Sequence, residues 1–225
     1  VSRYDAIMGS ELITPEERRL IRARLAYRAY ETAESGHWSL ERGMISGNPN
    51  MSVSLVVKTG LLGLALYDHP MGRKWANYAV KWVDYWLTET VDAGGSWPES
   101  SNYARHAYSL ILRFAIAARN AGMHDFFTYP GFKRLALYCE KTVTPPDPLR
   151  ISPRGKPLRA APVYGRGCRG DVHGLSAIAA AATASSDPEL SRVMQWSWRE
   201  SGYNEGFGWD RTAGASSSSR AGPKF

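Results

Sequence analysis

The stretch from residue 51 to residue 67 places the strongest constraint on the fold, because it reads as a helix without a polar face. Apolar residues occur on every side of that helix: Val53, Leu55, Val56, Val57, Leu61, Leu62, Leu64 and Leu66. A helix of this kind has to be covered on several sides by other elements. We therefore expect residues 51–67 to form an inner helix with the remaining elements packed around it.

Helical periodicity and helix-start signals predict further helices before and after this one. Thr14-Pro15-Glu16-Glu17 combines a capping threonine, a proline at the first helical position and a glutamate at the third. The predicted helices cover residues 14–36, 72–91, 100–122, 130–144, 173–185 and 187–202. Strand signals are almost absent. An all-α fold follows, and paired helices favour an α/α repeat or toroid over a four-helix bundle.

Charge narrows the class of partner. The 225 residues include 28 Lys and Arg against 21 Asp and Glu, a net charge of +7. This charge favours an anionic partner, which is a nucleic acid, a membrane surface or an acidic polysaccharide. No nucleic-acid-binding signature is present, and no apolar run is long enough to span a membrane. We assign residues 1–205 to one helical domain and residues 206–225, with four consecutive serines, to a tail or linker.

A long segment over residues 145–170 reads as an irregular loop, because it is rich in proline. It carries six basic residues and a single acid, Asp147, which makes it a candidate anion-facing loop; a merely solvated loop fits equally well. Cys139 and Cys168 either pair or stay reduced, and with scattered histidines they form no zinc pattern. We expect no metal site and no cofactor.

The stretch from Gly94 to Tyr108 passes from a loop into a helix that Ser100 or Ser101 can cap. It gathers a carboxylate, two phenols, a guanidinium and an imidazole at one helix entrance: Glu99, Tyr103, Arg105, His106 and Tyr108. Rigid helix entrances hold side chains where a ligand can reach them, which favours a functional site. A capped amphipathic helix with a solvated first turn explains the same residues equally well.

Three stretches carry a family resemblance. Gly47-Asn48-Pro49-Asn50-Met51 leads into the apolar run at residues 59–66, and Gly95-Ser96-Trp97-Pro98-Glu99-Ser100 is followed by two tyrosines. The third stretch is discontinuous and consists of residues 153–155, Gly170-Asp171, residues 186–190 and residues 196–201. In their order and spacing, these stretches resemble the helical domain of the heparinase II/III-like polysaccharide lyases, over roughly residues 14–202.

The resemblance implies an incomplete α/α toroid of paired antiparallel helices, which in this family is followed by a β-sandwich. The chain ends before such a sandwich, so we expect it to be a piece of a longer protein. The resemblance also implies a lyase that cleaves an acidic polysaccharide such as a glycosaminoglycan or alginate by β-elimination at a uronic acid. It implies a secreted or periplasmic location, although no signal peptide is visible.

Elimination across C4–C5 of a uronate requires a group that neutralises the carboxylate and groups that move protons. The resemblance maps neutralisation to Asn50, or less well to Asn48, although either asparagine also suits a helix cap or turn. It assigns proton transfer to Tyr103 or Tyr108, although packing in the hydrophobic core explains either ring equally well. We favour Tyr103, because it lies three residues before His106 on one helix face.

Other polar and aromatic residues are candidates for binding the substrate. Glu99 is interpreted as a charge at a helix N-terminus rather than as an orienting group. The candidate substrate-binding residues are Asn48, Trp97, Glu99, Arg105, Arg166, Arg169 and His173.

Two alternative functions stay open at this point. An inverting glycoside hydrolase on a similar toroid would use two carboxylates, Glu99 with Asp171 or Glu205. A helical module without catalytic activity would bind an anionic glycan through its basic loop.

Overall fold

The structure is a computed structural model of the chain. It describes residues 4–33, 49–151, 155, 157–159, 176–184 and 186–200. Helices predominate in this part of the chain, with one small two-stranded sheet. The chain forms two compact units, Val1–Cys139 and Glu140–Phe225. No helix within these ranges is both long enough and apolar enough to cross a membrane.

The first unit is helical throughout its regular elements. These are α1 Tyr4–Met8, α2 Pro15–Ala33, α4 Pro49–Ala65, α5 Gly72–Tyr85, the π-helical turn η2 Trp86–Thr90, α6 Ser101–Asn120, the 3-10 turn η3 Phe126–Thr128 and α7 Pro130–Lys141, which ends just past the unit boundary. The second unit contains β1 Asp147–Ile151, β2 Pro157–Leu158, α8 Ser176–Thr183 and α9 Pro188–Glu200. The predicted helices are confirmed to within a few residues where the structure describes them, and α1 is additional.

The start of α2 confirms the predicted capping signal. The Glu17 backbone N–H donates to Thr14 Oγ1 at 3.2 Å, and the Thr14 N–H donates to Glu17 Oε2 at 2.8 Å. These reciprocal bonds satisfy two backbone donors that the helix itself leaves without acceptors. The local sequence alone therefore decides where α2 begins.

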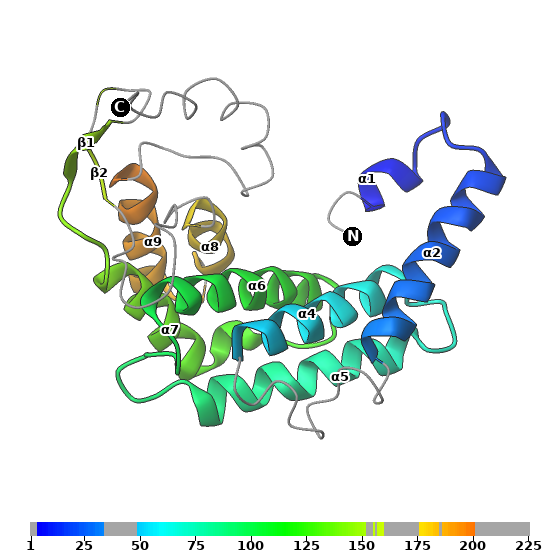
Figure 1. Cartoon of the computed structure of the whole chain (residues 1–225), viewed down its shortest axis with the longest axis horizontal. Coiled ribbons are helices and arrows are strands. Elements are labelled where there is room, and N and C mark those ends of the chain that lie inside the picture. Colours follow the sequence, from blue (N-terminus) through cyan, green and yellow to red (C-terminus); the bar gives the residue numbers. More distant parts are fainter. Residues whose placement is uncertain are drawn as a thin grey trace, which may run out of the picture. The chain divides into compact units, whose positions relative to one another are not determined.

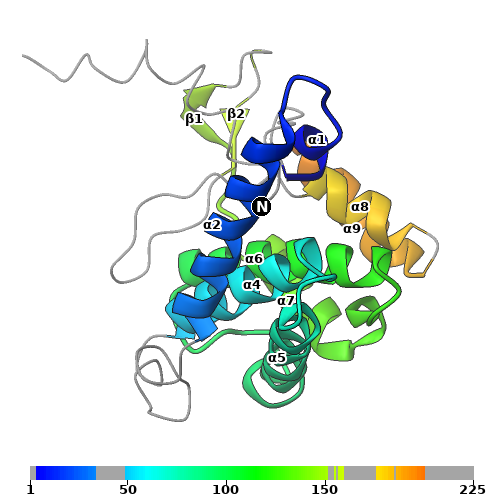
Figure 2. The same ribbon diagram turned by 90° about the vertical axis from the view of Figure 1, so that its right-hand side faces the viewer.

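The predicted inner helix is α4, which packs against α2, α5 and α6 (Figure 1). Figure 2 shows the same helices after a 90° turn. The buried side chains of α4 include Val53, Val56, Val57 and Leu62. Leu62 belongs to one buried cluster with Trp75 of α5. Burial of α4 on several sides confirms the interpretation of its apolar surface.

Small residues allow α4 and α5 to approach closely. A Cβ atom at Gly63 would lie 2.6 Å from both the Ala76 backbone nitrogen and the Gly72 carbonyl oxygen. No side chain can occupy that space unless the backbone of α5 moves. Glycine is therefore required at position 63 by the close approach of the two helices, and not by a backbone conformation that other residues avoid.

The prediction of an irregular loop over residues 145–170 is wrong for the two strands. β1 and β2 pair antiparallel, with Gly155 at a φ of 76° between them. A two-stranded sheet consists only of edge strands, so proline in either strand removes no bond from a central ladder. Proline content alone therefore concealed this pairing. The predicted boundary at residue 206 lies outside the described residues.

We predict that Gly63→Ala lowers the free energy of unfolding by about 1–3 kcal/mol, because the new methyl group collides with the backbone of α5. Urea denaturation measures the change. Gly9→Ala is the matched control, since a Cβ atom there meets nothing within 4 Å. Helix propensity by itself favours alanine over glycine, so a stabilised Gly63→Ala protein would contradict the close crossing.

Candidate functional site

The Glu99 carboxylate joins two segments that are distant in sequence. Its Oε2 accepts hydrogen bonds from the Asn50 backbone N–H at 2.7 Å and from the Trp97 indole N–H at 2.9 Å. Its Oε1 accepts from the Asn50 side-chain amide. One carboxylate thus fixes the N-terminus of α4 to the loop that enters α6. We call Asn50, Trp97 and Glu99 the Glu99 cluster.

Helix electrostatics explain why a carboxylate is placed there. Asn50 is the second residue of α4, so its backbone N–H has no acceptor within the helix. The N-terminus of a helix is also its positive end, which stabilises an anion. Asn50 and Trp97 are 6% and 3% exposed, and buried donors of this kind require acceptors.

Glu99 does act at a helix N-terminus, but the hydrogen bonds that show this are to α4 and not to the helix that follows Glu99. The interpretation of Asn50 as the cap of its own helix is wrong, because α4 begins at Pro49 and Asn50 is its second residue. The cap of α4 comes instead from Glu99, 49 residues later. Local sequence rules do not anticipate a cap from such a distance.

The entrance of α6 lies next to the Glu99 cluster in the chain. Ser100 occupies the N-cap position as predicted, but its side chain makes no capping bond. The Ser100 Oγ is buried and has no hydrogen-bond partner among the described residues. Tyr103 follows in the first turn of α6 and is half-buried.

His106 is the titratable group of this entrance with an altered pKa. His106 is exposed, yet the pKa of its imidazole lies below its ordinary value of 6.5, chiefly because neighbouring protein atoms displace part of its hydration. The positive charges of Lys58 and Arg113 lower this pKa further, and the negative charge of Glu99 opposes them. His106 is therefore neutral at pH 7 and can accept a proton.

Three other candidates are buried. Tyr108 is 5% exposed, with its ring 5.8 Å from that of Phe132. Arg105 is 9% exposed and donates to the carbonyl oxygen of Cys139. Trp97 donates to Glu99 from inside the protein, so its ring offers little surface to a sugar. These positions favour Tyr103 over Tyr108 as the phenol that meets a substrate.

Several predicted residues lie outside the described part of the chain. They are Asn48, Arg166, Arg169, His173, Cys168 and the alternative acids Asp171 and Glu205. Within the described part, no group of three or more His, Cys, Asp and Glu side chains is arranged to hold a metal ion.

Comparisons with protein-family models, with curated proteins and with solved structures each found no match to this chain. The lyase resemblance and the toroid arrangement therefore stay predictions. In the chain, the Glu99 cluster is followed directly by the entrance of α6, which carries Tyr103 and His106.

We predict that Glu99→Gln lowers the free energy of unfolding by about 1–3 kcal/mol, because an NH₂ group replaces one acceptor and faces an N–H donor. Urea denaturation followed by circular dichroism measures this change. Glu89→Gln is the matched control, since Glu89 is exposed on η2 and its replacement should change stability by less than about 0.5 kcal/mol. Equal effects of the two substitutions would contradict the role of Glu99.

We predict a pKa for His106 below 6.5 in the folded protein, measured by NMR titration of the ring protons. Lys58→Gln should raise this pKa by removing a repelling charge, and Glu99→Gln should lower it further. Lys81→Gln on α5 is the control and should leave it unchanged.

The pKa of His106 also predicts a dependence of stability on pH. The unfolded chain, with the ordinary pKa, binds more protons than the folded chain just below pH 6.5. The free energy of unfolding should therefore fall as the pH falls through this window, and His106→Asn should reduce that fall. An identical pH dependence of both proteins would count against the shift.

Proposed function

We propose that this chain is the helical part of a polysaccharide lyase that cleaves a uronic-acid-containing polysaccharide by β-elimination. We further propose that its helices belong to an incomplete α/α toroid. The observation that carries the proposal is the Glu99 cluster. It holds the Asn50 amide at the positive end of α4, and the chain continues from Glu99 directly into the helix that carries Tyr103 and His106.

The first requirement of elimination is to stabilise the carboxylate beside the C5–H bond, where negative charge accumulates as the proton leaves. In this proposal the Asn50 side-chain amide supplies that stabilisation; the N-terminus of α4 does not, because the Glu99 carboxylate already accepts from it. Glu99 keeps the amide in one orientation by accepting from both its backbone and its side chain. Preorganisation of this kind avoids a reorganisation cost during the reaction.

The second requirement is two proton transfers. The neutral imidazole of His106 accepts the C5 proton, and the C5–H electron pair forms the C4–C5 double bond. The C4–O bond breaks, and the phenol of Tyr103 protonates the glycosidic oxygen that leaves. His106 then returns its proton to Tyr103, which restores both groups. The lowered pKa of His106 supports its role as the base.

The contacts of Glu99 also separate this proposal from its alternatives. An inverting hydrolase needs Glu99 to act directly on the glycosidic bond or on water. Here the carboxylate accepts from three N–H groups of Asn50 and Trp97, which supports a positioning role instead. A glycan-binding module without catalysis would need neither Tyr103 nor His106 for its function.

We predict that Tyr103→Phe lowers kcat on alginate or heparin by about 10²- to 10⁴-fold, because the proton donor is lost. The increase in ultraviolet absorbance from the unsaturated product measures turnover. Tyr108→Phe is the matched control. It should retain activity, because its ring packs against Phe132 in the core.

Three results would overturn the proposal. Products with only saturated ends would identify a hydrolase. Unchanged turnover by Tyr103→Phe would remove the phenol from the mechanism. Tight binding of acidic polysaccharides without any turnover would identify a binding module.

A further inference from the structure

A hollow of about 420 Å³ lies between α2 and the turn that follows α4. This volume falls in the range of roughly 300–1,000 Å³ that is typical of small-molecule sites. The hollow is lined by Arg22, Ala23, Ala26, Tyr27, Tyr30, Leu66 and His69. None of these residues takes part in the mechanism proposed above.

The hollow is separate from the Glu99 cluster. Asn50 is the second residue of α4, and Leu66 directly follows its last residue. At about 1.5 Å per helical residue, the two positions lie roughly 24 Å apart along the helix. A ligand bound in the hollow would therefore not touch the proposed catalytic groups directly.

Exposed aromatic rings form much of the hollow. Tyr27 and Tyr30 are 63% and 49% exposed, and their spacing of three residues places them on one face of α2. The Tyr30 ring meets Trp75 edge-on, with centroids 5.0 Å apart. The His69 ring stacks on Trp75, with centroids 5.1 Å apart and planes 16° apart. The buried Trp75 thus supports two of the rings that line or border the hollow.

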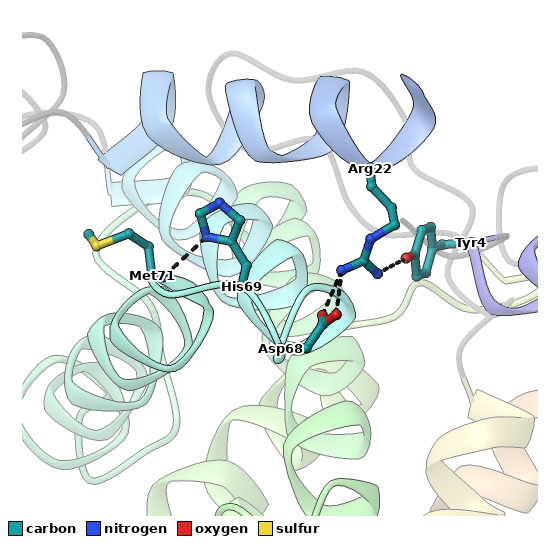
Figure 3. Close-up of polar contacts among 5 residues, drawn as sticks. All are labelled: Tyr4, Arg22, Asp68, His69 and Met71. Carbon is teal, nitrogen blue, oxygen red and sulfur yellow. Dashed lines mark hydrogen bonds and ion pairs between the residues drawn. The ribbon is translucent and has the colours of Figure 1, made fainter. Parts of the chain in front are cut away.

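A fixed polar group borders these rings. Arg22 Nη2 donates to both carboxylate oxygens of Asp68 at 2.7 Å, and Arg22 Nη1 donates to the Tyr4 hydroxyl at 2.7 Å (Figure 3). The hydrogen bond from Arg22 lowers the pKa of Asp68, which keeps its carboxylate charged. The Met71 N–H donates to His69 Nδ1 at 3.1 Å, so a neutral His69 carries its proton on Nε2 (Figure 3). These bonds hold the polar atoms beside the aromatic surface in fixed positions, and the surface of the hollow itself is mainly apolar.

This combination of exposed rings and a polar border suits a sugar ring better than another helix. A pyranose has an apolar C–H face that stacks on an aromatic ring, and hydroxyl groups at its edge that need donors and acceptors. A packed helix would need the apolar face of α2 to continue along its length. Instead, that face continues through Arg22 to Arg19 one turn earlier, as helical spacing requires.

The two arginines on this face of α2 are paired with acids, Arg22 with Asp68 and Arg19 with Glu16. Arg22 lines the hollow, and Arg19 extends the same face of α2. Arg73, whose guanidinium lies 5.3 Å from the centroid of the Tyr67 ring, adds a positive charge close to Leu66 in the chain. Charge at the hollow is therefore nearly balanced and does not by itself select an acidic sugar.

We propose that the hollow binds one pyranose ring of an acidic polysaccharide chain, at a second site that anchors the polymer away from the Glu99 cluster. The choice of polysaccharide rests on the proposed function. The presence of a sugar site in the hollow does not.

The test is the affinity of the full chain for alginate and heparin hexasaccharides, measured by isothermal titration calorimetry. Tyr27→Ala should weaken binding about tenfold, because it removes an exposed stacking ring. Tyr85→Ala is the matched control: its ring is 48% exposed on α5, and its loss should leave the affinity unchanged. Tyr27 makes no ring contact with Trp75 comparable to that of Tyr30, so the variant should fold normally.

Equal affinities of the Tyr27→Ala and Tyr85→Ala proteins would overturn the inference. A change of oligomeric mass or melting temperature in Tyr27→Ala without a change of affinity would also overturn the inference, because Tyr27 would then contact protein and not sugar. Equally tight binding of neutral cellohexaose would overturn the preference for an acidic sugar. If no polysaccharide is turned over but Tyr27→Ala still weakens binding, the lyase proposal fails and the sugar site stands.

Discussion

Burial of α4 is the constraint on which the first unit depends. Its apolar surface extends around the helix, so α2, α5 and α6 must all pack against it. Glycine at position 63 allows α5 to come close enough to do so. The polar groups of this unit are consequently placed where α4 begins and ends, because its middle is occupied by the core.

The N-terminus of α4 shows how a stability requirement creates a candidate site. A buried helix start leaves backbone N–H groups that need acceptors. Glu99 provides one, and in doing so it also holds the Asn50 amide in place. The same interaction thus joins two helical segments and holds in place the polar group to which the proposed function assigns the stabilisation of a carboxylate.

At the C-terminus of α4 the polar groups are arranged differently. There the Arg22–Asp68 ion pair and the stacked ring of His69 border an aromatic hollow that α2 and the following turn form together. Periodicity in α2 assigns Tyr27 and Tyr30 to one face, but it does not reveal whether that face is covered. The exposure of these rings depends on where α2 crosses α4.

Sequence alone determined the helical class, the approximate bounds of the helices, the capping of α2 and the inner position of α4. These features depend on residues within one or two turns of each other, so local patterns carry them. Tertiary structure alone decided that Glu99 caps α4, that Tyr108 and Arg105 are buried while Tyr103 is half-exposed, and that residues 147–151 pair as a strand. Those outcomes depend on contacts between segments far apart in the chain, which packing selects and no local pattern encodes.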